Sequence, residues 1–151
     1  MKRLSDRQKV FAKIEKLTGI KTMKKKTLTP KQLKSKYEHP MRDLIIERDG
    51  YRCQIKGKYH TCRGRLVADH RPVKRGNNRY FFDPRNLTCV CEGGNFLAEF
   101  DPAVNTAICE LVKRREGEPM YDYMVSTKGN PFKMTEQYVL DQIESLKRSI
   151  A

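Results

Sequence analysis

The stretch that decides the fold is Leu66-Val67-Ala68-Asp69-His70-Arg71-Pro72. Its apolar start predicts a short strand that delivers Asp69 and His70. Neighbouring residues of a strand point to opposite faces. The two side chains can therefore share one site only if the strand bends or ends there, and Pro72 is consistent with such an end. We expect this pair to form the centre of a candidate site.

Two asparagines extend this pattern, because Asn86 follows His70 by 16 residues and Asn95 comes nine residues later. The pKa of histidine lies near neutrality, which suits His70 to act as a general base. Asp69 and Asn95 offer the oxygen ligands that Mg²⁺ or Mn²⁺ prefers. The alternatives are a structural histidine, a turn residue at Asn86 and a helix N-cap at Asn95.

The residues around the asparagines predict the order strand, loop, strand, helix. The loop covers residues 73–79 and the second strand covers residues 86–91. A turn at Gly93-Gly94 then leads to a helix that opens at Asn95, is interrupted near residues 101–102 and continues to Val112.

A basic segment precedes this central part. The chain of 151 residues has a formal net charge of +14, and residues 1–48 contain fifteen Lys or Arg against five acidic residues. Lys24, Lys25 and Lys26 form a continuous basic run. We expect three helices, over about residues 5–17, from Pro30 onward, and over residues 41–48 after Pro40.

An irregular, Tyr-rich link and a final helix are expected after residue 117. Thr135 is the predicted N-cap, and Val139, Ile143, Leu146 and Ile150 form one apolar face. The sequence thus predicts an α+β protein with a basic helical arm (1–48), a central core (49–117) and a C-terminal linker and helix (118–151).

The charge and the cysteines bear on partners and compartment. A strongly basic protein of this size most often binds nucleic acid, although a solvated basic face is the alternative. Neither an apolar run long enough for a membrane span nor a signal-peptide pattern is present in the sequence. Five cysteines without a secretion signal predict reduced thiols, so we expect a cytoplasmic protein.

The central residues resemble the HNH endonuclease family, whose fold is the ββα-metal finger. The resemblance covers roughly residues 48–117, and it rests on Arg52-Cys53, the 66–72 stretch, Gly76, Asn86-Leu87, Cys91 and Asn95. Within that family, residues 82–86 and their spacing to Cys91 and Asn95 resemble the Rap/NinG type of lambdoid phage recombination nuclease. This resemblance implies a phage or mobile-element nuclease, acting in a bacterial host cytoplasm.

The resemblance also implies roles for individual residues. His70 would be the general base, Asp69 and Asn95 would bind the metal, and Asn86 would brace the loop and orient His70. Phosphate contacts are implied for the basic residues of the loop, and the lysine run would add affinity for the DNA backbone. The loop residues concerned are Arg71, Lys74, Arg75 and Arg79.

The cysteines depart from the two CxxC knuckles that hold structural zinc in many family members. Residues three positions after Cys53 and Cys91 are Lys56 and Gly94. A Cys₄ zinc site could still form if two further cysteines substitute, and the alternative is a set of buried free thiols. The four candidate ligands are Cys53, Cys62, Cys89 and Cys91, whereas His39 and His60 are expected at the surface.

Three functions compete at this point. The first is a metal-dependent endonuclease acting on duplex or branched DNA, for which cutting both strands would need a homodimer or two binding events. The second is a catalytically inactive DNA-binding or junction-binding protein with the same finger. The third is an RNA-binding protein, since basic residues interleaved with aromatic residues also suit single strands.

Overall fold

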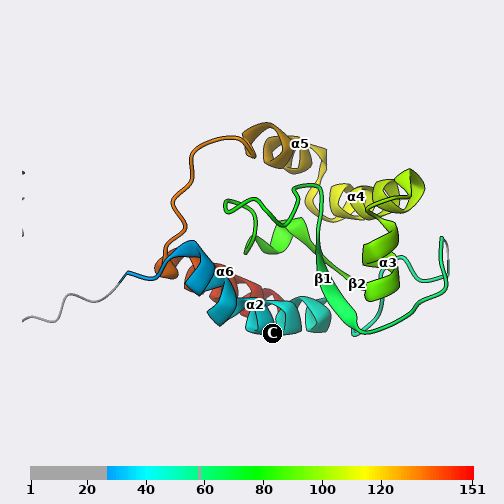
Figure 1. The fold of residues 1–151 in the computed structure, drawn as a ribbon, viewed down its shortest axis with the longest axis horizontal. Coiled ribbons are helices and arrows are strands. Elements are labelled where there is room, and N and C mark those ends of the chain that lie inside the picture. The colour runs from blue at the N-terminus through cyan, green and yellow to red at the C-terminus, as the bar shows by residue number, and fades with distance from the viewer. Residues whose placement is uncertain (1–26, 58) are drawn as a thin grey trace, which may run out of the picture.

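The computed structural model describes residues 27–57 and 59–151 (Figure 1). Within these residues the fold is α+β, as predicted, with one small antiparallel sheet and five α-helices. The predicted helix over residues 5–17 and the run Lys24-Lys25-Lys26 lie outside the described residues. The elements in order are α2 (Pro30–Arg48), β1 (Leu66–His70), η1 (Pro84–Asn86), β2 (Leu87–Cys91), α3 (Glu92–Leu97), α4 (Pro102–Glu116), α5 (Glu118–Thr127) and α6 (Glu136–Ile150).

The sheet is a hairpin of β1 and β2 with the loop 71–86 between them. Its register pairs Leu66 with Cys91 and His70 with Leu87. Helix α3 follows β2 without a connecting loop. The chain therefore has the predicted order of strand, loop, strand and helix, and Asp69 and His70 stand at the end of β1.

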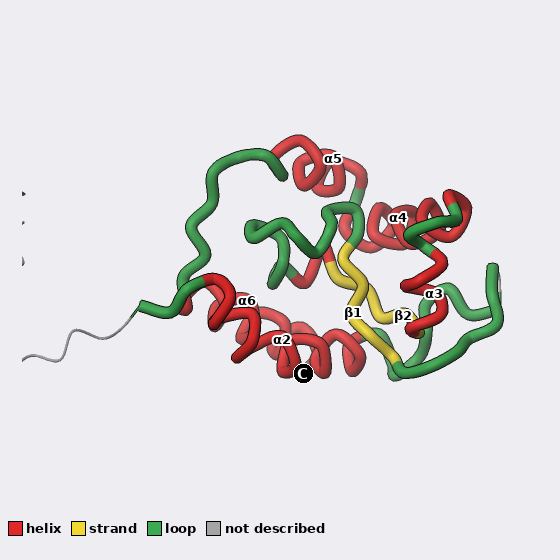
Figure 2. Tube along the Cα trace, viewed as in Figure 1, coloured by secondary structure: helices red, strands yellow, loops and turns green. Residues whose placement is uncertain are grey.

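Helices cover both faces of the hairpin (Figure 2). On one face, Leu87 and Cys89 of β2 share a core with buried residues of α2 and α6, including Leu33 and Val139. On the other face, Val90 packs into a second core with α4. Strand alternation separates the two cores, because successive side chains of β2 point to opposite faces.

Helix α2 is one continuous helix, so the predicted break at Pro40 is wrong. Thr29 forms a capping box with Gln32, and Pro30 occupies the first turn. Pro40 lacks the N–H of a helical hydrogen bond. The helix nevertheless continues because buried side chains on both sides of Pro40, Leu33 before it and Ile45 after it, enter the same core.

The region predicted as an irregular link contains helix α5, which corrects that prediction. Gly117, with φ of 85°, ends α4 and lets α5 begin at once. Met124 of α5 is buried with Val112 of α4. The Tyr, Val, Ser and Thr residues of α5 are weak helix formers, so packing on α4 stabilises this helix more than local propensity does. The Thr135 cap of α6 is confirmed.

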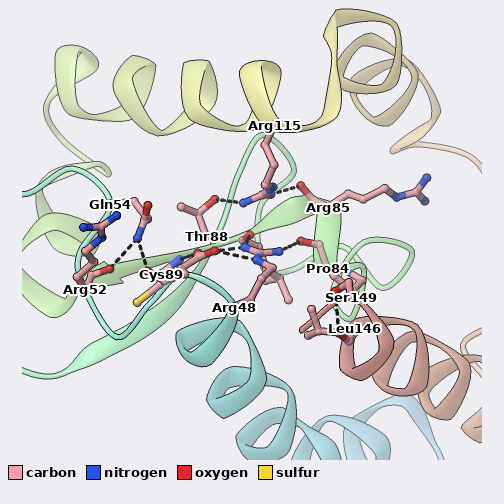
Figure 3. Close-up of polar contacts among 12 residues, drawn as sticks. Arg48, Arg52, Gln54, Pro84, Arg85, Thr88, Cys89, Arg115, Leu146 and Ser149 are labelled. Carbon is pink, nitrogen blue, oxygen red and sulfur yellow. Dashed lines mark hydrogen bonds and ion pairs between the residues drawn. The ribbon is translucent and has the colours of Figure 1, made fainter. Parts of the chain in front are cut away.

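Two arginines tie the helices to the hairpin (Figure 3). Arg48, at the end of α2, donates hydrogen bonds of 2.8 Å to the Pro84 carbonyl and 2.7 Å to the Leu87 carbonyl. Arg115, at the end of α4, donates to the Arg85 carbonyl at 2.8 Å and to Thr88 at 3.4 Å. These bonds satisfy carbonyl groups around η1 and hold the base of the loop in place.

Candidate functional site

Asp69 is a buried carboxylate without a hydrogen-bond donor among the described residues. It is 2% exposed, and neither Oδ1 nor Oδ2 accepts a hydrogen bond there. Arg71 Nη1 lies 3.2 Å from Oδ1 as an ion pair, but without hydrogen-bond geometry. Burial raises the pKa of Asp69 to about 6, although Arg71 and Lys74 oppose that rise. Two buried oxygens without donors can serve as metal ligands.

His70 is buried beside Asp69 and is held by the loop. Its Nε2 lies 3.1 Å from the carbonyl oxygen of Phe81. This bond assigns the proton to Nε2 and leaves Nδ1 as the proton acceptor. Burial lowers the pKa of His70 to about 4, although the Phe81 bond opposes that change. The imidazole is therefore neutral at pH 7, as a general base must be.

Asn86 lies completely buried at the base of the loop. Its Oδ1 accepts a hydrogen bond from the Val73 N–H at 2.9 Å, and its Nδ2 donates to the carbonyls of Val73 at 2.8 Å and Tyr80 at 3.3 Å. These bonds join both ends of the loop that carries Phe81. Asn86 does not line the pocket, so its connection to His70 runs through the backbone of the loop.

Asn95 lies inside helix α3 and is not its N-cap. The helix begins at Glu92, and its N-cap is Cys91, whose Sγ accepts a hydrogen bond from the Gly94 N–H at 3.2 Å. Gly93 and Gly94 are therefore helical, which corrects the predicted turn. Asn95 lines the same pocket as Asp69 and His70. The structure thus brings together three residues that the sequence singled out.

The pocket has a volume of about 440 Å³ and lies between helix α2 and the hairpin. Asp69 and His70 of β1, the loop and α3 form one wall, and Glu38, His39 and Arg42 of α2 line the other. Helix α2 was not expected to contribute to the site, since its charges do not repeat at a spacing that indicates a pocket. His39 is exposed, as predicted.

Arg71, predicted as a phosphate contact, lines the pocket but is only 3% exposed. Its guanidinium donates to Asn105 Oδ1 at 2.8 Å, to the His70 carbonyl at 3.0 Å and to Glu99 Oε1 at 2.6 Å. Lys74 also donates to both Glu99 oxygens at 2.9 Å. Glu99 was missed, although its position one turn after Asn95 could have indicated it.

The other predicted phosphate contacts occupy different surroundings. Arg75 forms an ion pair with Glu38 of α2 at the pocket. Arg79 lies away from the pocket lining, with its guanidinium near the rings of Tyr80 and Phe132. Arg75 is an exposed cation at the pocket, with 65% of its side chain accessible to solvent.

A second cluster joins Cys53, His60, Cys62 and Cys91. Their ligand atoms all lie within 4.8 Å of one another, so the cluster could bind a metal ion. His60 Nε2 is 3.0 Å from Cys91 Sγ, 3.7 Å from Cys62 Sγ and 3.9 Å from Cys53 Sγ. A tetrahedral zinc ion with ordinary bond lengths separates a sulfur and a nitrogen ligand by about 3.6 Å. The distances fit such a site.

The composition of this cluster corrects the Cys₄ prediction, because His60 takes the place of Cys89. Cys89 instead packs in the core shared with α2 and α6. His60 reaches the cluster because Gly94 has no side chain, and a Cβ there would lie 3.0 Å from His60 Nε2. The pair His60-x-Cys62 was the available signal.

The thiols of the cluster differ in acidity. Burial alone would raise the pKa of Cys91, but hydrogen bonds from the Gly94 and Arg63 backbones and from His60 lower it to about 6. Burial raises the pKa of Cys53 to about 12. A bound metal ion would deprotonate both thiols, since its charge outweighs the effect of burial.

No family model matches this chain, and no match was found among curated proteins or among solved structures. Within residues 27–57 and 59–151, the structure has no helix with the length and apolar character of a membrane span.

Proposed function

We propose that this protein is a metal-dependent endonuclease of the HNH type, which hydrolyses phosphodiester bonds of DNA. The observation that carries the proposal is the shared pocket of Asp69, His70 and Asn95, in which the buried carboxylate lacks hydrogen-bond donors among the described residues and the imidazole is neutral. A hairpin whose second strand leads into a helix, with the Asp-His pair on its first strand, supports the same assignment.

The pocket suits a hard divalent cation. The donorless oxygens of Asp69 and the amide oxygen of Asn95 would hold Mg²⁺ or Mn²⁺, with substrate and water as the remaining ligands. The ion would stabilise the charge that develops at the phosphate and on the leaving oxygen. Arg71 partly neutralises the charge of Asp69 through its contact with Oδ1.

His70 would act as the general base through Nδ1. Water forms a bond to phosphorus, Nδ1 takes the proton of that water, and the bond from phosphorus to the leaving oxygen breaks. A neighbouring phosphodiester anion stabilises the imidazolium and so raises the low pKa that burial imposes on His70. The Phe81 carbonyl keeps the ring in place throughout.

We further propose that the Cys53, His60, Cys62 and Cys91 cluster is a structural Zn²⁺ site. Three sulfurs and one nitrogen form a complete tetrahedral set, which leaves no position for a substrate. Cys91 is also the N-cap of α3, and Asn95 lies one turn further along that helix. Zinc would therefore fix the helix that carries a ligand of the second metal.

The ion pairs of the pocket favour one alternative, a DNA-binding or junction-binding protein without catalysis. Lys74 and Arg71 both donate to Glu99, so fewer cations are free to stabilise a transition state. Under this alternative the protein binds DNA with the same finger, and His70 has a structural role.

Cleavage of supercoiled plasmid and of a labelled four-way junction separates the two functions. We expect cutting with Mg²⁺ or Mn²⁺, and a loss of at least about 100-fold in His70→Ala, the usual scale for removing a general base. Thermal unfolding and zinc content of the variant serve as folding controls. Binding without cutting, equal in both proteins, would contradict the enzyme. RNA as a competitor tests the RNA-binding prediction in the same assay.

A further inference from the structure

Phe81 connects His70 to helix α2. Its carbonyl oxygen accepts the hydrogen bond from His70, and its ring lies 4.9 Å from the imidazole, centroid to centroid. The Nζ of Lys34 stands 4.3 Å from the centroid of the same ring, and the guanidinium of Arg75 stands 5.8 Å from it. The buried Phe81 thus contacts a predicted base and two cations, and these cations, Lys34 and Arg75, are 41 residues apart in sequence.

The positive charge of Lys34 and Arg75 exceeds the negative charge beside them. Glu38 is the acidic partner of Arg75. The Lys34 ammonium group has three N–H donors. Within residues 27–57 and 59–151, none of them donates to a hydrogen-bond acceptor, and Nζ lies over the face of the Phe81 ring. Burial and the charge of Arg75 lower the pKa of Lys34, while Glu38 raises it. An added anion would relieve this repulsion.

These charges act on the pocket itself. Arg75 and Glu38 line it together with His70. Arg75 and Lys34 also contribute to the lowered pKa of His70, after the larger effect of burial. An anion bound between Lys34 and Arg75 would therefore lie within electrostatic reach of the imidazole.

We infer that Lys34 and Arg75 form an anion subsite that binds a backbone phosphate of the nucleic acid next to the phosphate that is cut. In the absence of nucleic acid, Glu38 takes the place of that phosphate on Arg75. The inference rests on the proposed function and assigns to helix α2, outside the finger, a part in binding the strand. Lys34 binds the strand in this scheme and takes no part in the chemical step.

Helix α2 provides a matched control. Lys36 is two residues from Lys34 and carries the same charge, but it donates to Glu136 of α6 at 2.8 Å. Removing either lysine changes the net charge equally, so a difference between them reports the local contact. Glu38 has a similar control in Glu47, which lines a separate groove between α2 and α6.

The test measures binding of a fluorescein-labelled duplex and a labelled four-way junction by anisotropy, in a His70→Ala background without divalent cations. Lys34→Ala should weaken binding about 5- to 10-fold and reduce the slope of log K against log salt by about one, whereas Lys36→Ala should change affinity by about twofold or less. Lys34→Arg should restore most of the affinity. Glu38→Gln should tighten binding, and Glu47→Gln should not.

Equal losses in Lys34→Ala and Lys36→Ala, with equal salt slopes, would overturn the subsite. This result is independent of cleavage, which is measured separately with His70 intact. A protein that cuts no DNA but loses affinity specifically at Lys34 retains the subsite without the nuclease. Thermal unfolding of Lys34→Ala shows whether loss of its contact with Phe81 has disturbed the fold.

Discussion

The pocket at Asp69 and the cluster at Cys91 lie on the same hairpin but are built from opposite chemistry. The pocket combines side-chain oxygens, a neutral imidazole and ion pairs around a volume of about 440 Å³. The cluster places three sulfurs and one nitrogen within 4.8 Å of one another, around the position of a single ion. Open sites with hard ligands suit chemistry, whereas closed sites with soft ligands suit structure.

The two sites are also mechanically connected. Cys91 ends β2 and caps α3, and Asn95 follows one turn later on that six-residue helix. A helix this short has little stability by itself. Its position, and with it the position of Asn95, depends on what holds Cys91. Under the proposed function, the cluster at Cys91 would therefore set the geometry of the pocket at Asp69.

The largest expected effect comes from breaking the cluster. Cys91→Ala should abolish zinc binding and remove the several kcal/mol of stability that a structural zinc site supplies. Cys89→Ala is the matched control and should retain one zinc per chain, because Cys89 packs in the opposite core. Zinc content and chemical denaturation measure both effects. Equal zinc loss in the two variants would restore the Cys₄ arrangement.

Asp69→Asn should separate function from stability. Metal-dependent cleavage should fall about 10³-fold, because the charged ligand is lost. In zinc-loaded protein without Mg²⁺ at pH 8, the free energy of unfolding should rise by about 1–3 kcal/mol, since the carboxylate pKa of about 6 shows that the buried charge is disfavoured. A variant that is both inactive and less stable would show that Asp69 is a structural ion-pair residue.

Asn86→Ala should lower stability by about 2–4 kcal/mol, because it leaves the Val73 and Tyr80 backbone groups buried without partners. Cleavage measured well below the melting temperature should also fall, since the loop no longer holds the Phe81 carbonyl against His70. Unchanged cleavage in a destabilised variant would limit Asn86 to a role in folding.

The pH dependence of stability should report His70. Its folded pKa of about 4 lies below the usual value of 6.5, so the unfolded chain binds more protons between these limits. Stability from the neutral ring is complete above pH 6.5 and is lost as the pH falls toward 4.

Comparison with His70→Ala at each pH isolates this contribution from Asp69 and from zinc. Relative to the variant, the wild type should lose up to about 3 kcal/mol across that range. Parallel stability curves for the two proteins would mean that the ring is not buried in its neutral form.

Local sequence determined the elements that depend on near neighbours. The Leu66–His70 strand with its Asp-His end, the Thr135 cap with its apolar stripe, and the approximate positions of β2 and α4 were all predictable from residues a few positions apart. Short-range patterns set backbone preference and the direction of side chains, and these act within one strand or one helical turn.

Only the tertiary structure decided which distant residues meet. Helix α2 continues past Pro40, and His60 rather than Cys89 completes the cysteine cluster. Arg71, expected at a phosphate, is buried and donates to Glu99. Each outcome depends on packing between segments far apart in the chain, and the energy of such contacts exceeds the local preference that opposes it. Sequence spacing singled out the candidate site residues, while long-range packing decided which side chains lie beside them.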